Sequence, residues 1–194
     1  MTRIDTTTPP PIAGSLADEV ICRRIVLGER ELFAEIVSRY QGAIFRLCLR
    51  AMGNHHDAEE VAQEVFLRAF RGLKHFNGSA RFSTWLTRIA LNQISSVFGS
   101  KQSRIQRRCD LFETEQHGGA ATSEEIESGA MAERMVVGIR QLKPMFRDVI
   151  ILCGFEGRPY EEVAQLIGIP VGTVRSRLNA ARIELRKIID AELS

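Results

Sequence analysis

The feature that most constrains the fold is an apolar pattern near the C-terminal end of the chain. From residue 171 onward, apolar residues recur at spacings of three and four, at Val171, Val174, Leu178, Ala181, Leu185 and Ile188. This spacing places all six side chains on one face of an α-helix, where they can pack on other helices. The other periodic segments also have the helical repeat, and none alternates convincingly as a β-strand would. The sequence therefore predicts an all-α protein.

The helical segments fall into two groups, which predict two small domains. Four amphipathic helices lie within residues 15–100, and a smaller set lies within residues 134–194. We expect Ser15 and Asp18 to cap the first helix, and Asp57 and Glu60 to form a capping box at the start of the third. The buried face of that third helix is expected to include Val61, Val65, Phe66, Ala69, Phe70 and Leu73. Residues 1–14 are expected to be a disordered tail, and residues 101–133 a linker.

Composition is that of an ordinary globular protein and excludes several classes. The chain has 194 residues, of which 44% are hydrophobic and 26% charged, which excludes a wholly disordered chain. No apolar run reaches the roughly 20 residues of a membrane span, and residues 1–15 lack the core of a signal peptide, so we expect a cytoplasmic protein. Because Cys22, Cys48, Cys109 and Cys153 are far apart without CxxC spacing, we expect reduced, mostly buried thiols rather than zinc or disulfides.

The formal net charge of +2 conceals an uneven distribution along the chain. Residues 101–108 hold four basic and no acidic side chains, whereas residues 109–133 hold seven acidic and no basic ones. The acidic stretch has little apolar periodicity, which is typical of a solvated, flexible linker. Residues 171–187 carry five basic side chains and one acidic. Positive charge is therefore concentrated on the last helix.

The segment from Tyr160 to Ile188 predicts a helix-turn-helix. Residues 160–167 form a short helix, Gly168-Ile169-Pro170 a stop and turn, and Val171 begins a longer helix. The exposed sector of the longer helix holds Arg175, Ser176, Asn179, Arg182 and Arg186, all away from its apolar face. Guanidinium and amide groups can read base edges in the major groove. The alternative is that these charges only solvate a terminal helix.

Two features of the first group indicate a binding partner. On the third helix, Gln63, Glu64 and the apolar Leu67 remain outside the buried face, which suggests a docking surface, although a solvated face with one stray leucine is the alternative. The loop from Phe76 to Phe82 combines aromatic, small polar and arginine residues, which can hold an unpaired base. By composition alone, Phe82 and Trp85 would instead be core residues. Beside the loop, a polar stripe is expected along the fourth helix at Arg88, Asn92, Ser95 and Ser96.

Taken together, these motifs resemble those of the bacterial RNA polymerase sigma factors of the extracytoplasmic-function group. In the first domain the resemblance is carried by residues 54–70 (NHHDAEEVAQEVFLRAF) and residues 81–92 (RFSTWLTRIALN). In the second it is carried by residues 160–164 (YEEVA) and residues 170–178 (PVGTVRSRL). Two motif sets in the family's order make the resemblance specific.

The resemblance implies a non-enzymatic initiation factor with two DNA-binding domains. Region 2 (residues 15–100) would bind core RNA polymerase at the beta-prime clamp helices and capture the melted minus-10 element, whereas region 4 (residues 134–194) would read the minus-35 element. The beta subunit, promoter DNA and a regulatory anti-sigma factor are further implied partners. The implied polymerase-binding residues are Gln63, Glu64 and Leu67. The implied minus-10 residues are Phe76, Asn77, Gly78, Ser79, Ala80, Arg81, Arg88 and Asn92. The implied minus-35 residues are Thr173, Arg175, Ser176, Asn179 and Arg182.

The sequence departs from the family pattern at two places. Residues 95–100 (SSVFGS) stand where many members have an arginine-rich helix end, so we expect phosphate contacts to shift to Lys101, Arg104, Arg107 and Arg108. Ala180 stands where an arginine is frequent. Both departures affect the expected promoter preference and leave the predicted architecture unchanged.

Two other classes of function remain as alternatives. A conventional helix-turn-helix repressor or activator would account for Arg175 and Asn179 but not for the Gln63 surface or the aromatic loop. An enzyme would need a reactive constellation, and the four histidines have no paired carboxylate, nucleophile elbow, P-loop or metal spacing. We therefore expect no catalytic residue, metal site, cofactor or small-molecule substrate.

Overall fold

Within the residues that the structure describes, every regular element is helical. The computed structural model describes residues 16–105, 131 and 134–191, and it contains no strand in these ranges. The prediction of an all-α protein with two helical domains and a C-terminal helix-turn-helix is confirmed. Ser15, Cys109, the predicted tail and the acidic part of the predicted linker lie outside the described residues. The described helices include none long and apolar enough to cross a membrane.

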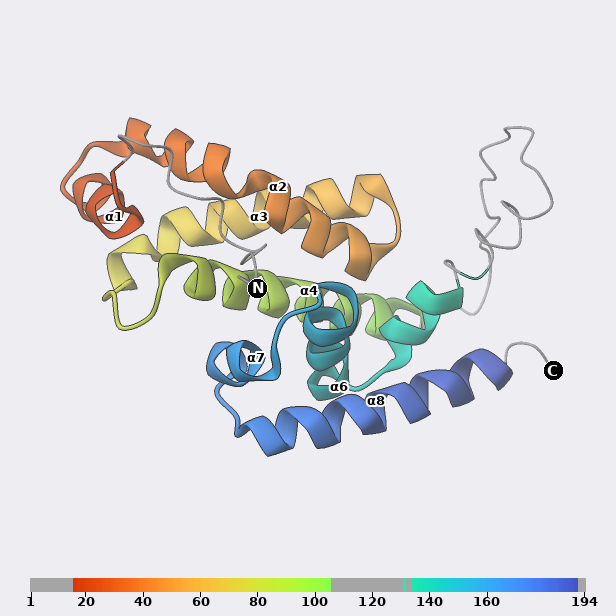
Figure 1. Cartoon of the computed structure of the whole chain (residues 1–194). Coiled ribbons are helices and arrows are strands. Elements are labelled where there is room, and N and C mark those ends of the chain that lie inside the picture. The colour runs from red at the N-terminus through yellow and green to blue at the C-terminus, as the bar shows by residue number, and fades with distance from the viewer. Residues whose placement is uncertain (1–15, 106–130, 132–133, 192–194) are drawn as a thin grey trace.

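The first domain consists of four helices and two short 3-10 turns. The helices are α1 (Asp18–Val26), α2 (Phe33–Met52), α3 (His55–Gly72) and α4 (Phe82–Ile105), with η1 (Arg30–Leu32) before α2 and η2 (Leu73–His75) after α3. Figure 1 shows α2 and α3 lying side by side over one face of α4, with α1 at one end. Because α4 continues to Ile105, it extends past the predicted domain boundary at residue 100.

A tight turn at Gly53 and Asn54 joins α2 to α3. Gly53 ends α2 with a φ of 77°, a left-handed conformation that glycine adopts without the steric cost of a Cβ. The side chain of Asn54 then caps α3, accepting a hydrogen bond of 2.8 Å from the backbone amide of Asp57. The predicted capping box at Asp57 and Glu60 is therefore wrong, because the helix begins earlier and Asp57 already lies in its first turn.

An acidic side chain at the start of α1 fastens this helix to α2. Asp18 is the first residue of α1 and not its cap, so this part of the prediction is wrong, whereas Ser15 lies outside the described residues. Ala17, which precedes α1, provides no side-chain cap. The Asp18 carboxylate instead accepts a hydrogen bond from the Arg39 guanidinium at 2.6 Å and another from the Tyr40 hydroxyl. Burial, together with this carboxylate, raises the pKa of the Tyr40 hydroxyl, which therefore stays a donor at physiological pH.

The second domain begins with a helix at residues 134–141 and ends with the helix-turn-helix. Between them lie α6 (Pro144–Val149) and the π-helical turn η3 (Ile150–Phe155), followed by α7 (Tyr160–Ile167) and α8 (Val171–Ala191). Arg147 on α6 is buried, with only 4% of its surface exposed. Its guanidinium donates to the carbonyl oxygens of Ile139, Arg140 and Leu142 at 3.1, 2.9 and 2.8 Å. These bonds satisfy carbonyls at the end of the helix at residues 134–141, which have no partner within that helix.

The two domains pack against each other, although the sequence predicted only that a flexible linker joins them. Helix α7 lies against α4, and η3 lies against α2, as Figure 1 shows for α7 beneath α4. The Phe98 ring near the end of α4 is buried, and the Arg147 guanidinium of the second domain lies 4.3 Å from its centroid. The buried apolar side chains of both domains form one continuous cluster.

A half-buried carboxyl in the second domain, that of Asp148, predicts a pH-dependent stability. Burial raises the pKa of Asp148 to about 6, although Arg147 and Arg177 nearby act in the opposite direction, and Asp148 Oδ1 has no hydrogen-bond partner among the described residues. A carboxyl whose pKa is raised by folding stabilises the protein fully below its unfolded pKa of about 4, and loses that contribution as the pH rises through about 6. At neutral pH the ionised, half-buried carboxylate is therefore destabilising.

We expect Asp148→Asn to raise the free energy of unfolding at pH 7.5 by about 1–3 kcal/mol. The advantage over wild type should disappear between about pH 6 and pH 4, where the wild-type carboxyl takes up a proton. Urea unfolding at a series of pH values measures this difference, with Glu161→Gln at an exposed position of α7 as the control. An advantage of equal size at pH 4.5 and pH 7.5 would contradict the prediction.

Candidate DNA-binding and protein-binding surfaces

The helix-turn-helix is built by a glycine turn and by one apolar seam. Gly168 ends α7 in the left-handed conformation with a φ of 72°, and its amide donates to the Ala164 carbonyl at 2.9 Å. The chain reverses at Ile169 and Pro170, and the Pro170 carbonyl accepts the first amide bonds of α8, from Thr173 and Val174. The seam is buried at Val163, Ala164 and Leu166 on α7 and at Val174, Leu178, Ala181 and Leu185 on α8.

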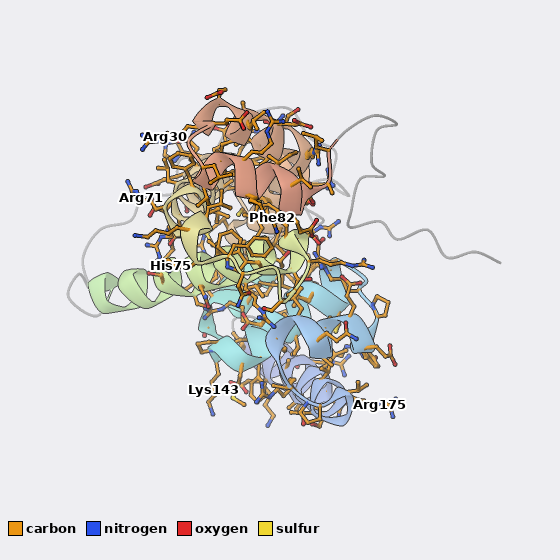
Figure 2. All side chains as sticks on the ribbon, turned by 90° about the vertical axis from the view of Figure 1, so that its left-hand side faces the viewer. Arg30, Arg71, His75, Phe82, Lys143 and Arg175 are labelled. Carbon is orange, nitrogen blue, oxygen red and sulfur yellow. The ribbon has the colours of Figure 1, made fainter. Side chains whose placement is uncertain are left out.

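Packing of this seam leaves the predicted reading face of α8 exposed. Arg175, Ser176, Asn179 and Arg182 are all exposed, and Thr173 is half-buried. The Ser176 hydroxyl donates back to the Thr173 carbonyl at 3.1 Å. The Arg175 guanidinium lies 5.9 Å from the centre of the Tyr160 ring, and Figure 2 shows Arg175 at the outer edge of the second domain. All five predicted minus-35 residues therefore lie within the first twelve residues of α8.

The predicted docking surface on α3 lies beside a groove that the sequence analysis missed. Gln63 is exposed, Leu67 is 49% exposed, and Glu64 is half-buried and accepts a hydrogen bond of 2.8 Å from Arg68. Gln63 also lines a groove between α2 and α3, together with Val37, Gln41, Gly42, Phe45, His55, Glu59, Ala62 and Phe66. The α2 side of this groove could be assigned only once α2 and α3 were paired.

An aromatic side chain that was predicted to be buried extends the apolar part of the α3 surface. Phe70 is 37% exposed, so the prediction that it belongs to the core is wrong. Its ring packs edge to face against Phe33 of α2, with 4.9 Å between the ring centres. Phe70 lies one turn beyond Leu67, because the two residues are three positions apart on a helix. The exposed α3 surface therefore contains two large apolar side chains.

The loop between α3 and α4 has a firm aromatic base and an exposed polar tip. Phe82 is buried, as expected for a large aromatic residue, while Phe76 and Trp85 are half-buried. The three rings pack together with their centres 5.2 to 5.5 Å apart, and Figure 2 shows Phe82 between the helices of the first domain. At the tip, the Ser79 amide donates to the Asn77 side chain at 3.1 Å, and Gly78 has a φ of 72°. Asn77, Gly78, Ser79 and Arg81 are exposed, and Ala80 is half-buried.

A small pocket lies between this loop and α1. It is lined by Glu19, Cys22, Arg23 and Val26 of α1, Leu73 and Lys74 of η2, and Phe76, Asn77 and Gly78 of the loop. Arg23 and Lys74 are exposed and place positive charge at the pocket. Neither residue could be assigned to this pocket from the sequence, because no sequence pattern indicates that α1 lies against the loop.

Part of the polar stripe on α4 contacts the second domain. Asn92 is exposed, as predicted. Arg88 is also exposed in part, but its Nη2 atom donates to the Gln165 carbonyl at 3.0 Å and its Nε atom donates to the Leu166 carbonyl. Both carbonyls lie at the end of α7. The structure therefore brings one predicted minus-10 residue against the helix-turn-helix of the other domain.

Two thiols and one group of possible metal ligands lie among the described residues of the first domain. Burial raises the pKa of the Cys22 and Cys48 thiols to about 12, so both stay protonated and unreactive at physiological pH. Among the described residues, His56, Asp57 and Glu60 are the group whose possible metal-ligand atoms gather within 4.8 Å. His56 and Glu60 are exposed, and the Asp57 carboxylate already accepts a hydrogen bond from Asn54, which favours a role at the start of α3.

Comparison with known proteins places both domains in one family. Residues 36–104 match the model of Sigma-70 region 2, and residues 134–185 match that of Sigma-70 region 4. The ECF RNA polymerase sigma factor SigW of Bacillus subtilis is 33% identical over 175 residues, which cover 85% of this chain and 92% of SigW. The ECF RNA polymerase sigma-E factor of Escherichia coli is 34% identical over 175 residues, which cover 86% of this chain and 91% of the relative.

Solved structures share the fold. CnrH, solved in complex with the cytosolic domain of CnrY, aligns with a TM-score of 0.58 at 24% identity over 91% of this chain and 99% of CnrH. The sigma factor RpoE of Bartonella quintana, solved with the anti-sigma factor NepR, aligns with a TM-score of 0.56 at 22% identity over 81% of this chain and 96% of RpoE. Because regions 2 and 4 follow each other in one chain and the sequence relatives exceed 30% identity over most of both lengths, the chain belongs to the extracytoplasmic-function sigma factors of RNA polymerase.

Proposed function

We propose that this sigma factor directs core RNA polymerase to promoters by reading the minus-35 element with α8 and capturing a minus-10 base with the loop before α4. The observation that carries the proposal is the exposed face of α8, which holds Arg175, Ser176 and Asn179 on a complete helix-turn-helix. A guanidinium can bind guanine with two hydrogen bonds, and a carboxamide can bind adenine in the same way. Such a helix can enter the major groove.

The α3 surface is proposed to bind the clamp helices of the polymerase beta-prime subunit. Leu67 and Phe70 expose apolar area, and Gln63 connects this area to the groove between α2 and α3. An apolar centre with a polar rim is typical of a protein interface. The groove can accept side chains of a partner helix, which adds shape complementarity to the residues named from the sequence.

The loop at residues 76–81 is proposed to hold one unpaired base of the minus-10 element. Its exposed polar tip can bind base edges, and Arg23 and Lys74 beside it can neutralise the adjoining phosphates. Extruding a base costs a few kcal/mol, whereas stacking returns about 1–3 kcal/mol per base. A single loop can therefore trap an opened base, while the polymerase is needed to open the promoter.

The proposed role consists of binding steps alone. The sigma factor supplies binding free energy at a chosen site, which requires no catalytic residue, cofactor or small-molecule substrate. An anti-sigma factor that covers these surfaces is proposed as the regulator, and the complex of the Bartonella relative with NepR supports this partner.

Run-off transcription with core polymerase on a randomised promoter library tests the proposal most directly. We expect the selected promoters to share two elements that appear only when both core polymerase and this chain are present. In parallel, the isolated chain should bind duplex promoter weakly at physiological salt. Tight, sequence-specific binding by the isolated chain, without an effect on polymerase, would instead identify a conventional repressor or activator.

We expect the double variant Gln63→Ala, Glu64→Ala to weaken association with core polymerase about tenfold or more, equivalent to about 1.4 kcal/mol. The fold should be retained, because Gln63 is exposed and a surface pair such as Glu64 with Arg68 contributes less than about 1 kcal/mol. Labelled chains titrated with core polymerase measure the affinity. Glu31→Ala on exposed η1 is the control. Equal affinities for the double variant and the control would remove the assignment.

We expect Arg175→Ala to reduce the discrimination of the holoenzyme at one base pair of the minus-35 element by about 1–3 kcal/mol of binding free energy. Discrimination at the other base pairs should change much less. The measurement is competition between promoters that differ at single minus-35 positions, using holoenzyme made with each variant. Arg186 is an exposed arginine farther along α8, so Arg186→Ala is the matched control. It should change the affinity of the holoenzyme for all promoters equally, or leave it unchanged. If Arg175→Ala also weakens every promoter equally, Arg175 binds phosphate instead of a base.

A further inference from the structure

Two side chains of the helix-turn-helix, one from each helix, lie next to each other. Tyr160 is the first residue of α7, and its half-buried ring packs against the continuous apolar cluster. Arg175 extends from the second turn of α8 and is exposed. Its Cζ atom lies over the Tyr160 ring, 5.9 Å from the ring centre. The two helices therefore form a contact between an aromatic face and a guanidinium.

The ring is held by packing, whereas the arginine depends on its neighbours to restrict it. An exposed arginine side chain has many rotamers, and it loses that freedom when it binds a partner. A carboxylate can restrict a guanidinium, as Glu162 does for Arg158 with 2.7 Å between the paired atoms. No carboxylate among the described residues pairs with Arg175, and the Tyr160 ring takes that place.

An aromatic ring can restrict a guanidinium without using its hydrogen-bond donors. A cation is attracted to the face of a ring by the ring quadrupole, and an arginine makes this contact with the flat face of its guanidinium. The N–H groups lie at the edge of that plane and stay free to donate. Reading a guanine requires two of them in one orientation. A guanidinium that is already held over a ring loses less freedom on binding, so the correct base is bound more tightly.

The neighbouring residues of the exposed α8 face are positioned without the ring. The Ser176 hydroxyl is held by its own helix, because it donates to the Thr173 carbonyl at 3.1 Å. Asn179 is exposed one turn beyond Arg175 and has a shorter side chain with fewer rotamers. Loss of the ring should therefore affect the base pair that Arg175 reads and leave the others unchanged.

We propose that Tyr160 is a positioning residue for promoter reading, whose ring holds the Arg175 guanidinium in the orientation that binds a guanine of the minus-35 element. Tyr160 thereby raises discrimination at one base pair without touching that base. The proposal rests on the proposed role of Arg175 in reading a base. It assigns part of the specificity to α7, a helix that carries none of the residues assigned to DNA.

Three substitutions separate the parts of the Tyr160 side chain. Tyr160→Phe keeps the aromatic face and removes the hydroxyl. Tyr160→Leu removes the aromatic face and keeps apolar bulk, and Tyr160→Met does the same with a flexible side chain that fills irregular space. Phe146→Leu on α6 is the matched control, because Phe146 is another half-buried ring packed against the same apolar cluster. Circular dichroism and thermal unfolding check that each full-length variant keeps its fold.

The measurement is competition for holoenzyme between promoters that differ at single minus-35 base pairs. At the base pair where Arg175→Ala acts, Tyr160→Leu and Tyr160→Met should reduce discrimination about two- to fivefold, the size of an exposed contact between a cation and a ring. Tyr160→Phe and Phe146→Leu should match wild type at every base pair. In an Arg175→Ala background, Tyr160→Leu should cause no further loss at that base pair, because the side chain that it positions is gone.

The outcomes separate this proposal from the proposed function. An equal loss of affinity for all promoters with Tyr160→Leu and Tyr160→Met would mean that the ring only supports the fold, and would overturn the proposal. Loss of discrimination with Tyr160→Phe would assign the effect to the hydroxyl and overturn positioning by the ring. A further loss in the Arg175→Ala background would mean that Tyr160 touches the base itself, which also overturns it.

These three outcomes leave the proposed reading role of Arg175 intact. That role fails separately if Arg175→Ala weakens every promoter equally, and the positioning role of Tyr160 then fails with it.

Discussion

The arrangement of this protein depends on how its helix ends are satisfied. The last carbonyls of a helix lack partners within it, and in a compact all-α chain many of them are turned away from water. Arg147 satisfies the end of the helix at residues 134–141 from within its own domain. Arg50, Arg88 and Arg140 satisfy helix ends across the domain boundary. The same pairing of guanidinium with carbonyl thus shapes the second domain and fixes its position against the first.

Helical periodicity was sufficient to predict the fold class and the helix-turn-helix, because both follow from local spacing. The seam of α8 and the Gly168 turn appear in the structure as the spacing indicated. Helix starts were predicted less well. Asp57, followed three residues later by Glu60, fits the sequence pattern of a helix cap, but Asn54 is also a residue type that caps helices. The left-handed turn at Gly53 ends α2 just before Asn54, and Asn54 is therefore the cap of α3. Phe70 was misassigned for a similar reason, since a residue at the edge of an apolar face can lie on either side.

The candidate surfaces also differ in whether one local segment or several distant segments form them. The α8 face could be named from the sequence because one helix supplies all of it. The groove between α2 and α3, and the pocket where Arg23 and Lys74 meet the loop, are each made by segments that are separate in the chain. The contact of Arg88 with α7 joins residues 77 and 78 positions apart. No periodicity or motif encodes such a pair, and the acceptors are backbone atoms that every residue possesses.

Arg88 donates only to backbone carbonyls at the end of α7. The side chains on the exposed face of α8 therefore take no part in this contact between the domains. Arg175 and Asn179 on α8 are exposed, and Asn77 and Asn92 of the first domain are exposed as well, although Arg88 is engaged by α7. The arginine contacts are partly exposed and charged, and they are therefore sensitive to ionic strength and individually weak. Packing of the two domains therefore combines these contacts with the continuous apolar cluster, which salt does not screen.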